Sequence, residues 1–520
     1  MLFNREGGIL LHLTSLPGPY GIGEIGPQAI RWLDALADMG QALWQILPLG
    51  PTGASYSPYQ STSSFAAAEN LLSVERLWED GLLDRRDLID FPSLPHDHVE
   101  YDAATAARLP LLRKAASVLT AKAMPRLRAA CDEFRAAHAC WLNDYALFVA
   151  LKEAHRGRAW TRWSPPLRDR DPQALDEARR HLAEAITRTE VLQFLFARQW
   201  ATLRVAARAL GIRLIGDIPI FVAHDSADVW AHRELFHLDE IGRPTVVAGV
   251  PPDYFSKTGQ RWGNPLYRWE VHEAQQFAWW VARIRRSLDW VDVVRIDHFR
   301  GFAAYWEIPA RHRTAVNGRW VNGPGDAFFA AAQQQLGDLP IVAEDLGYIT
   351  EDVIALRDRF GFPGLRVLPV GFGPDEGSRY FLPESYVENC VAYTGTHDND
   401  TIVGWFRGEA DGTDTRTPEE VERERQALLA LVGTDGREIH WDCMKLLLES
   451  RAGAVMFPLQ DLLGLGSEAR MNTPGRRQGS WRWRFRWEQL PVAAEARLAA
   501  LTSATGRNGA SRQSAVGSGQ

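Results

Sequence analysis

The sequence has few cysteines, no long hydrophobic run and no excess of basic charge. Its 520 residues include four cysteines, whose spacing fits neither a disulfide framework nor a zinc site. No apolar run is long enough to cross a bilayer, and the amino terminus has no basic and apolar regions of a secretion signal. The net charge of −7 comes from interspersed charges and disfavours phosphate-rich partners. We therefore expect a cytoplasmic protein with no membrane or nucleic-acid partner.

The remaining composition is that of an ordinary globular protein, with 46% hydrophobic and 24% charged residues. A chain of this length is ample for a large catalytic domain with an insertion. The 20 tryptophans mostly suit a core, but such rings also stack on the apolar face of sugars while polar neighbours bind hydroxyls.

Eight short strand-like runs alternate with helical patterns such as 27–39, 327–336 and 350–359. The runs are 8–15, 42–50, 213–222, 291–299, 339–347, 364–372, 390–398 and 452–461. Several are continuously apolar, which is typical of parallel strands buried on both faces. The alternation predicts an α/β fold, a (β/α)₈ TIM barrel. A doubly wound open sheet is the alternative, but no Gly-rich phosphate motif follows the first strand.

The gaps between the runs are unequal and indicate two insertions. A helical insertion, about 75–210, is expected between strands 2 and 3, with an apolar stripe that includes Leu192, Phe196 and Trp200. Within it, 165–171 is expected to be a loop. A second insertion, about 223–285, is rich in Gly, Pro and aromatics and would hang over the barrel mouth. We expect residues 1–502 to form a single catalytic domain and 503–520 a disordered tail.

Three acidic residues follow three of the runs: Asp297, Glu344 and Asp398. A polar residue at the carboxyl end of a buried barrel strand points into the mouth, where such folds keep their active sites. Three carboxyl groups brought together there can break a glycosidic bond. One attacks, one donates and recovers a proton, and the third shapes the distorted sugar.

The neighbours of the first two acids suit these roles. Arg295 lies two residues before Asp297, on the same side of a strand, where its guanidinium would keep the carboxylate ionised. A structural ion pair is the alternative. Glu344 would need a raised pKa, from burial or a nearby negative charge, to act as a general acid. Alternatively, Glu344 or Asp345 caps the next helix.

Other polar residues follow the remaining runs. His397 and Asp398 could bind a metal, but no ligand set at the required spacing appears, so sugar hydroxyls are the favoured ligands. Asp217 ends the third run and either caps a loop or contacts substrate. Tyr59, after the second run, could stack on the sugar being cleaved.

The motifs together resemble the 4-α-glucanotransferases of glycoside hydrolase family 77, also called amylomaltases or disproportionating enzymes. The matching segments are 47–53, 57–61, 216–222, 249–255, 259–269, 295–301, 343–347, 394–399, 458–461, 470–475 and 481–484. The chain departs from the family pattern at Tyr56, at 67–70 and at Ser480, which affects loops and outer subsites rather than the three acids.

The resemblance implies that Asp297 is the nucleophile, Glu344 the acid/base and Asp398 the stabiliser of the transition state. It implies further residues around the cleaved sugar: Tyr59, Asp217, Trp262, Arg295, His397 and Asn472. It also implies a loop over the site that touches the donor: Tyr254, Phe255 and Ser256. No metal or cofactor is implied, and the sequence makes no prediction of oligomeric state.

The implied reaction moves a segment of an α-1,4-glucan to the 4-hydroxyl of another glucan or of glucose through a covalent glycosyl-enzyme. Maltooligosaccharides, amylose and glucans derived from starch or glycogen are the implied substrates. A hydrolase with the same carboxylates and a non-catalytic glycan-binding barrel are the alternatives. We expect Tyr254 and Phe255 to favour transfer by holding the acceptor and limiting water. Alternatively, their rings pack on the barrel rim.

Overall fold

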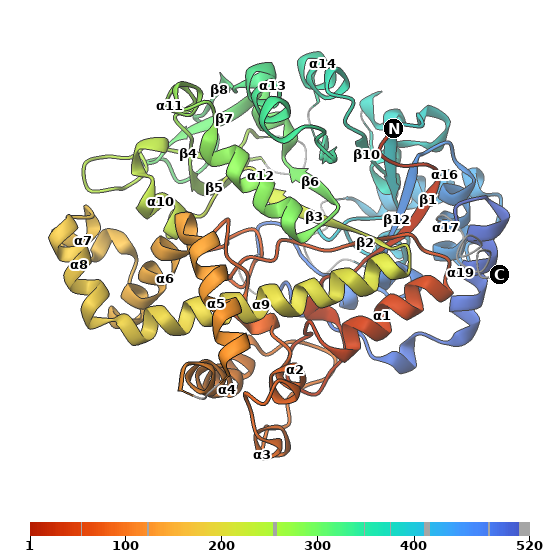
Figure 1. The fold of residues 1–520 in the computed structure, drawn as a ribbon. Coiled ribbons are helices and arrows are strands. Elements are labelled where there is room, and N and C mark those ends of the chain that lie inside the picture. Colours follow the sequence, from red (N-terminus) through yellow and green to blue (C-terminus); the bar gives the residue numbers. More distant parts are fainter. Residues whose placement is uncertain are drawn as a thin grey trace, which may run out of the picture.

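Eight parallel strands close into a barrel in the computed structural model, which describes residues 1–53, 55–121, 124–252, 257–347, 349–374, 376–409, 416–476 and 479–508. Around the barrel the order is β1-β12-β11-β10-β9-β6-β3-β2. Figure 1 shows part of the barrel, including β1, β2, β3, β6 and β12. The strands are β1 (Glu6–Leu10), β2 (Leu43–Gln45), β3 (Arg213–Pro219), β6 (Val293–Asp297), β9 (Ile341–Ala343), β10 (Gly364–Val367), β11 (Cys390–Tyr393) and β12 (Ala454–Pro458). The predicted (β/α)₈ barrel is confirmed, and each strand lies within or overlaps its predicted run.

The strands are shorter than the runs that predict them. The run 42–50 contains only the three residues of β2: the Leu47 N–H donates to the His12 side chain at 3.3 Å rather than to a strand, and Pro48 has no N–H to donate. Every residue of β2, β9, β10, β11 and β12 is buried, which explains the continuous apolar sequence of β9, β11 and β12. After several of the strands the chain continues into the mouth with polar side chains, among them Glu344 after β9 and His397 after β11.

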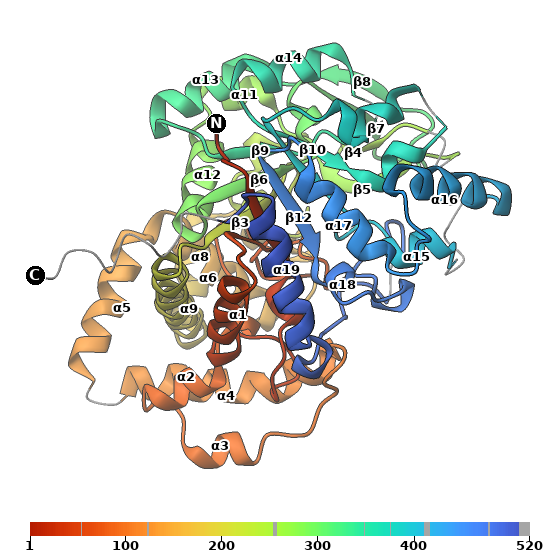
Figure 2. The same ribbon diagram turned by 90° about the vertical axis from the view of Figure 1, so that its right-hand side faces the viewer.

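Helices surround the barrel, and the three predicted helical patterns are present. These helices are α1 (Pro27–Asp38), α13 (Gly325–Leu336) and α14 (Glu351–Arg359). Proline occupies the first turn of α1, where its missing N–H costs nothing. Further helices of the layer are α12 (Ala278–Trp290), α15 (Ile402–Arg407), α16 (Pro418–Val432), α17 (Ile439–Glu449) and α19 (Val492–Ala504). Figure 2 shows α1 beside α19, which it contacts.

The helical insertion lies between β2 and β3. Its helices are α2 (Val74–Glu79), α3 (Arg85–Ile89), α4 (Tyr101–Ala121), α5 (Pro125–Ala137), α6 (Ala139–Ala154), α7 (Pro165–Arg168), α8 (Pro172–His181) and α9 (Ala183–Ala209). The stripe of α9 is buried, and the indole of Trp200 donates to the Trp290 carbonyl at 2.8 Å, which fixes α9 to the end of α12. The prediction of a loop at 165–171 is wrong in part, since prolines at the first two positions start α7.

A four-stranded antiparallel sheet, which the sequence does not predict, stands beside the barrel in the order β5-β4-β7-β8. It contains β4 (Val246–Val250), β5 (Gln260–Pro265), β7 (Ala304–Pro309) and β8 (Arg319–Asn322). The first two strands belong to the insertion after β3 and the other two follow β6. Because β4 pairs with the distant β7, no hairpin signal marks this contact in the sequence.

The chain is structured beyond the start of the predicted tail. α19 continues through Ala504, and the buried guanidinium of Arg507 donates to the carbonyls of Leu448, Ser450 and Ala452 at 2.6, 2.8 and 2.9 Å. A tail from 503 is therefore wrong as far as 508, and 509–520 lie outside the described residues. Among the described residues, no helix has the length and apolar character needed to span a membrane.

Candidate active site

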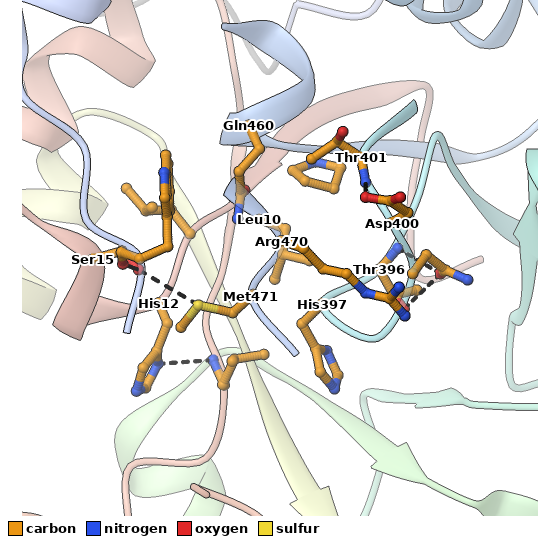
Figure 3. A pocket seen from close by; sticks show the side chains of 15 residues that line it. Leu10, His12, Ser15, Thr396, His397, Asp400, Thr401, Gln460, Arg470 and Met471 are labelled. Carbon is orange, nitrogen blue, oxygen red and sulfur yellow. Dashed lines mark hydrogen bonds between the residues drawn. The ribbon is translucent and has the colours of Figure 1, made fainter. Parts of the chain in front are cut away.

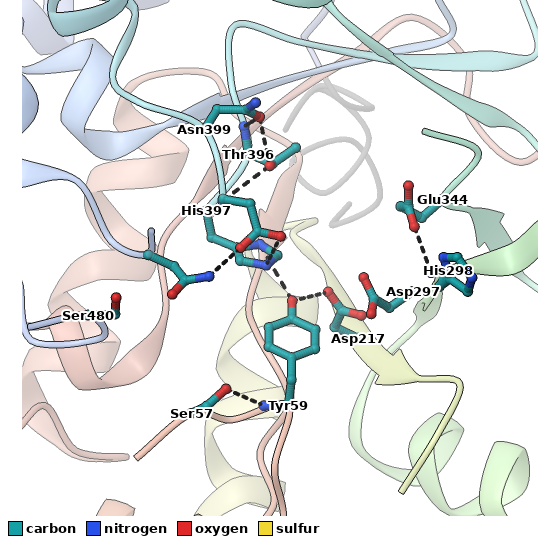
Figure 4. Close-up of polar contacts among 12 residues, drawn as sticks. Ser57, Tyr59, Asp217, Asp297, His298, Glu344, Thr396, His397, Asn399 and Ser480 are labelled. Atoms are coloured by element: carbon teal, nitrogen blue, oxygen red, sulfur yellow. Dashed lines mark hydrogen bonds and ion pairs between the residues drawn. The ribbon is translucent and has the colours of Figure 1, made fainter. Parts of the chain in front are cut away.

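The three predicted carboxylates all end or follow barrel strands, and Figure 4 shows two of them, Asp297 and Glu344, beside His298. Asp297 is the last residue of β6, and Glu344 directly follows the neighbouring strand β9. The backbone of Glu344 continues the pairing, with its N–H donating to the Ile296 carbonyl at 3.0 Å. Asp398 lies in the loop after β11. The structure thus brings together three acids that are 47 and 54 residues apart in sequence, from 297 to 344 and from 344 to 398.

Arg295 holds two carboxylates on one wall of the mouth. Its Nη2 donates to Asp297 Oδ1 at 3.0 Å, and its Nη1 donates to Asp217 Oδ2 at 2.5 Å. Asp217 lies opposite Arg295 in the pairing of β3 with β6. Burial alone would lower the pKa of Arg295, but the two carboxylates hold it well above its usual value. The Arg295 guanidinium therefore stays positively charged.

Burial shifts both acids of this wall upward. It raises the pKa of Asp217 to about 6, against the effect of the Arg295 charge. The pKa of Asp297 is also raised, by burial first, while Arg295 opposes the shift and Asp398 adds to it. Asp217 Oδ1 is buried and accepts no hydrogen bond from the described residues. Asp297, with 28% of its side chain exposed, is the carboxylate that faces the open mouth.

Glu344 is the most buried of the three acids, with an exposure of 8%. Burial raises its pKa to about 7, Arg295 lowers it, and the charge of Asp297 raises it further. Its two oxygens accept backbone N–H groups, Oε2 from His298 at 2.6 Å and Oε1 from Leu346 at 2.8 Å. His298 has a left-handed backbone with a φ of 53°, an uncommon conformation that aims this N–H at Glu344.

The adjacent Asp345 has a structural role. Its carboxylate accepts from Arg357 Nη1 at 2.5 Å and from the Leu365 N–H at 2.7 Å. Thr350 is the N-cap of α14, so neither Glu344 nor Asp345 caps the next helix. Of the two neighbouring acids, only Glu344 faces the mouth, because successive side chains leave a strand on opposite sides.

The opposite wall holds Asp398 between a histidine and an amide. His397 Nε2 lies 3.4 Å from Asp398 Oδ2, and Asn472 Nδ2 donates to Asp398 Oδ1 at 2.5 Å. Its position in the mouth would by itself raise the pKa of Asp398, but His397 and Asn472 hold it well below its usual value. Burial alone would lower the pKa of His397, but Asp398 raises it.

Tyr59 touches both walls. Its hydroxyl donates to Asp217 Oδ2 at 2.8 Å and lies 3.5 Å from His397 Nδ1. Its ring stacks on His397, with centroids 4.9 Å apart and planes 17° apart, and Trp481 packs against both rings at 5.8 Å. Sequence reasoning gave Trp481 no role, although it begins one of the matching motifs. The stacking partner of Tyr59 in this structure is a histidine.

Trp262, on β5, brings the antiparallel sheet to the site. Its ring meets His298 edge to face with centroids 4.8 Å apart, and its indole N–H donates to Gln260 Oε1 at 3.1 Å. Tyr254, Phe255 and Ser256 lie outside the described residues. In the described part of the chain, no group of three His, Cys, Asp or Glu side chains is placed to hold one metal ion.

The fold and this mouth define a class of enzyme, the carboxylate-dependent enzymes that act on glycosidic bonds. Residues 11–490 match the family model described as 4-alpha-glucanotransferase, glycoside hydrolase family 77, and the chain belongs to this family.

Similar proteins carry the same description. The chain is 51% identical over 508 residues to a 4-alpha-glucanotransferase of Thermus thermophilus, covering 97% of this chain and 99% of the relative. It is 46% identical to a 4-alpha-glucanotransferase of Synechocystis, covering 98% and 99%. Among solved structures, the amylomaltase from Streptococcus agalactiae in complex with acarbose superposes with a TM-score of 0.91 at 37% identity, covering 97% of this chain and all of that one. The resemblance inferred from the motifs is confirmed.

Proposed function

We propose that this chain is a retaining 4-α-glucanotransferase that works through a covalent glycosyl-enzyme. The observation that carries the proposal is the presence of three carboxyl groups in one mouth, each in a different electrostatic environment. Asp297 lies beside a permanent cation, Glu344 is buried with a pKa of about 7, and Asp398 is held ionised by His397 and Asn472. Environments that separate the pKa values of neighbouring acids separate their roles.

In the first half of the reaction, Asp297 attacks the anomeric carbon of the donor glucan. Glu344, in its protonated form, gives its proton to the glycosidic oxygen, so the bond from the anomeric carbon to that oxygen breaks as the bond to Asp297 forms. The part of the donor that carries the released 4-hydroxyl then leaves the site. Asp398 binds hydroxyls of the distorted ring, and this contact strengthens as the positive charge of the oxocarbenium-like transition state develops.

In the second half, the ionised Glu344 takes the proton from the 4-hydroxyl of an acceptor sugar. The acceptor oxygen attacks the anomeric carbon and displaces Asp297, which restores both carboxyl groups and the α-1,4 linkage. Two displacements at one carbon retain its configuration. A water molecule in the place of the acceptor gives hydrolysis through the same intermediate.

The proposed substrates are maltooligosaccharides, amylose and glucans derived from starch or glycogen. The acarbose complex of the relative from Streptococcus agalactiae supports this class, as do the rings of Tyr59, Trp262 and Trp481 at the mouth. Tyr59, Asp217, Trp262, Arg295, His397 and Asn472 form the proposed donor site. Tyr254, Phe255 and Ser256 stay in the proposal through the family resemblance alone.

The proposed setting is a reducing cytoplasm. All four cysteines are among the described residues and are free, and three of them are buried. Free buried thiols are typical of proteins that fold where disulfides do not persist.

Incubation with maltotriose followed by sizing of the products tests the reaction. Transfer gives glucose together with oligomers longer than maltotriose. Glucose and maltose without longer products, at all acceptor concentrations, would identify a hydrolase instead. In the same reaction, the newly formed linkages should be α, and β products would contradict a double displacement.

A further inference from the structure

Arg470 lies behind the wall that carries Asp398, two residues before Asn472. Figure 3 shows it beside Thr396 and His397, lining a cavity of about 30 Å³. A space of this size holds a water molecule and is far too small for a sugar ring. Arg470 touches neither Asp297 nor Glu344 through a hydrogen bond between described residues, and the cavity is too small to be a sugar subsite.

The guanidinium of Arg470 spans two backbone carbonyls. Its Nη2 donates to the carbonyl oxygen of Asp398 at 2.8 Å, and its Nε donates to the carbonyl oxygen of Asn472 at 2.8 Å. Two further bonds join the same segments: the Asn472 N–H donates to the His397 carbonyl at 3.0 Å, and Asn472 Nδ2 donates to Asp398 Oδ1 at 2.5 Å. Arg470 therefore contacts the backbone of both Asp398 and Asn472.

Asp398 depends on these hydrogen bonds because of its place in the fold. Its side chain is 43% exposed, and it lies in a loop past the end of β11, so neither packing nor a strand ladder fixes the carboxylate. Asp297, in contrast, ends a strand and is bound directly by Arg295. A planar guanidinium fixes two acceptors at once in one geometry, which a lysine ammonium does not reproduce.

We propose that Arg470 is a positioning residue that holds the Asp398 carboxylate in its productive orientation by binding the carbonyls of Asp398 and Asn472. The inference rests on the proposed role of Asp398. Displacements of about 1 Å in a group that acts in the transition state cost up to about 100-fold in rate. An interaction that strengthens in the transition state changes kcat more than KM.

The test compares Arg470→Lys with Arg204→Lys in steady-state turnover of maltotriose. Arg204 is a matched control, because it is also half-buried and donates to two backbone carbonyls, those of Leu288 and Asp289, at the entry to β6 rather than at the mouth. We expect Arg470→Lys to lower kcat by about 10- to 100-fold with KM changed by less than about twofold. We expect the control to retain its kcat. Equal losses in both variants would overturn the proposal.

A double-mutant cycle with Asp398→Asn separates positioning from general stabilisation. Turnover is measured with a maltosyl fluoride donor, which needs no proton from the enzyme, in single-turnover reactions. If Arg470 acts through Asp398, then Arg470→Lys costs less than about twofold in the Asp398→Asn background. If Arg470→Lys lowers the rate by the same factor in the wild-type and Asp398→Asn backgrounds, the proposal is overturned. Should the lysine variant not fold, Arg470→Gln replaces it in the same cycle.

The Asp398→Asn single variant of this cycle also tests the proposed function. Asp398→Asn alone with undiminished turnover would remove Asp398 from the mechanism, and the inference about Arg470 would fall with it. A crippled Asp398→Asn variant beside a fully active Arg470→Lys variant would overturn the inference alone.

Discussion

The two walls of the mouth hold a carboxylate in different ways. On the wall of β3 and β6, Arg295 contacts both Asp217 and Asp297 and is permanently charged. On the opposite wall, Asp398 is paired with His397, whose charge depends on pH, and with the neutral Asn472. The first wall is built from strand residues in register, and the second from loop residues joined by side-chain contacts. A permanent ion pair therefore backs Asp297, and an adjustable network backs Asp398.

The difference shows how three acids in one mouth keep separate tasks. Burial raises the pKa of Asp297 and Glu344, and their mutual repulsion adds to the shift of Glu344, whereas the pKa of Asp398 is lowered. With these directions, Asp398 is the first of the three to ionise as pH rises, and Glu344 keeps its proton up to about pH 7.

Replacing the carboxylate of the first wall should have the largest effect. Asp297→Asn keeps the shape of the side chain and its contact with Arg295 but removes the proposed nucleophile, so we expect kcat on maltotriose to fall by at least about 10⁴-fold. The measurement is product formation over long incubation, with a thermal unfolding curve to show that the barrel remains intact.

Asp292→Asn is a control for this variant. Asp292 also lies at β6, but at its opposite end, where it accepts from Arg204 Nη2 at 2.5 Å. We expect some loss of stability and no change in kcat. An Asp297→Asn variant that folds and keeps more than a few per cent of the rate would show that another group attacks the sugar.

The buried acid between the walls should show an effect that depends on the donor. Glu344→Gln removes the proton donor, so we expect kcat on maltotriose to fall by about 10³- to 10⁴-fold. A donor with a fluoride leaving group needs little protonation and should still load the enzyme. In the proposed mechanism, deglycosylation also needs Glu344 as a base, so the glycosyl adduct should accumulate on Asp297 and be visible by mass spectrometry. An adduct on any other residue would reassign the nucleophile.

The sequence predicts the first wall better than the second. Asp217, Arg295 and Asp297 lie on strands, and a period of two residues places Arg295 and Asp297 on the same side. The pairing of Asp398 with Asn472 joins residues 74 positions apart, and no periodicity relates them. Their proximity is implied by the family resemblance rather than by pattern.

The elements that the sequence missed have the same origin. The sheet β5-β4-β7-β8 forms from strands on both sides of β6, and Arg470 acts through backbone carbonyls, which leave no trace in residue type. Local signals also misled: Pro165 and Pro166 suggest a loop but start α7. The barrel itself was predictable because several of its buried parallel strands are continuous apolar runs that alternate with helical patterns.

The pH dependence of turnover should distinguish the walls. Burial raises the pKa of Glu344 to about 7, and only its protonated form cleaves an unactivated donor, so kcat on maltotriose should fall about tenfold per pH unit above about pH 7. In Glu344→Gln with a fluoride donor, the rate of adduct formation should not show this alkaline limb. If the alkaline limb persists unchanged in this variant, it belongs to another group, such as His397.

The acid limb should belong to the first wall. The pKa of Asp297 is raised, and that of Asp398 is held well below its usual value. As pH falls, Asp297 is therefore protonated before Asp398 and loses its nucleophilicity. Asp297 and Glu344 interact closely, so the limbs report the pair rather than either residue alone. Asn472→Ala should leave the acid limb in place, since it acts on Asp398, and a shifted limb would assign it to the second wall.

The smallest predicted effect concerns Tyr59, the residue that joins the walls. Tyr59→Phe removes the hydroxyl that donates to Asp217 but keeps the ring that stacks on His397. A lost hydrogen bond costs about 1 kcal/mol, or roughly fivefold in kcat/KM. Tyr59→Ala also loses the ring, so we expect a loss several times larger. Tyr386→Phe is the control, since its buried hydroxyl donates to the Phe381 carbonyl at 2.9 Å at a distance from the mouth. If Tyr59→Phe matches the control while Tyr59→Ala is impaired, the ring of Tyr59 joins the walls without its hydroxyl. If the two Tyr59 variants are equally impaired, the hydroxyl joins the walls.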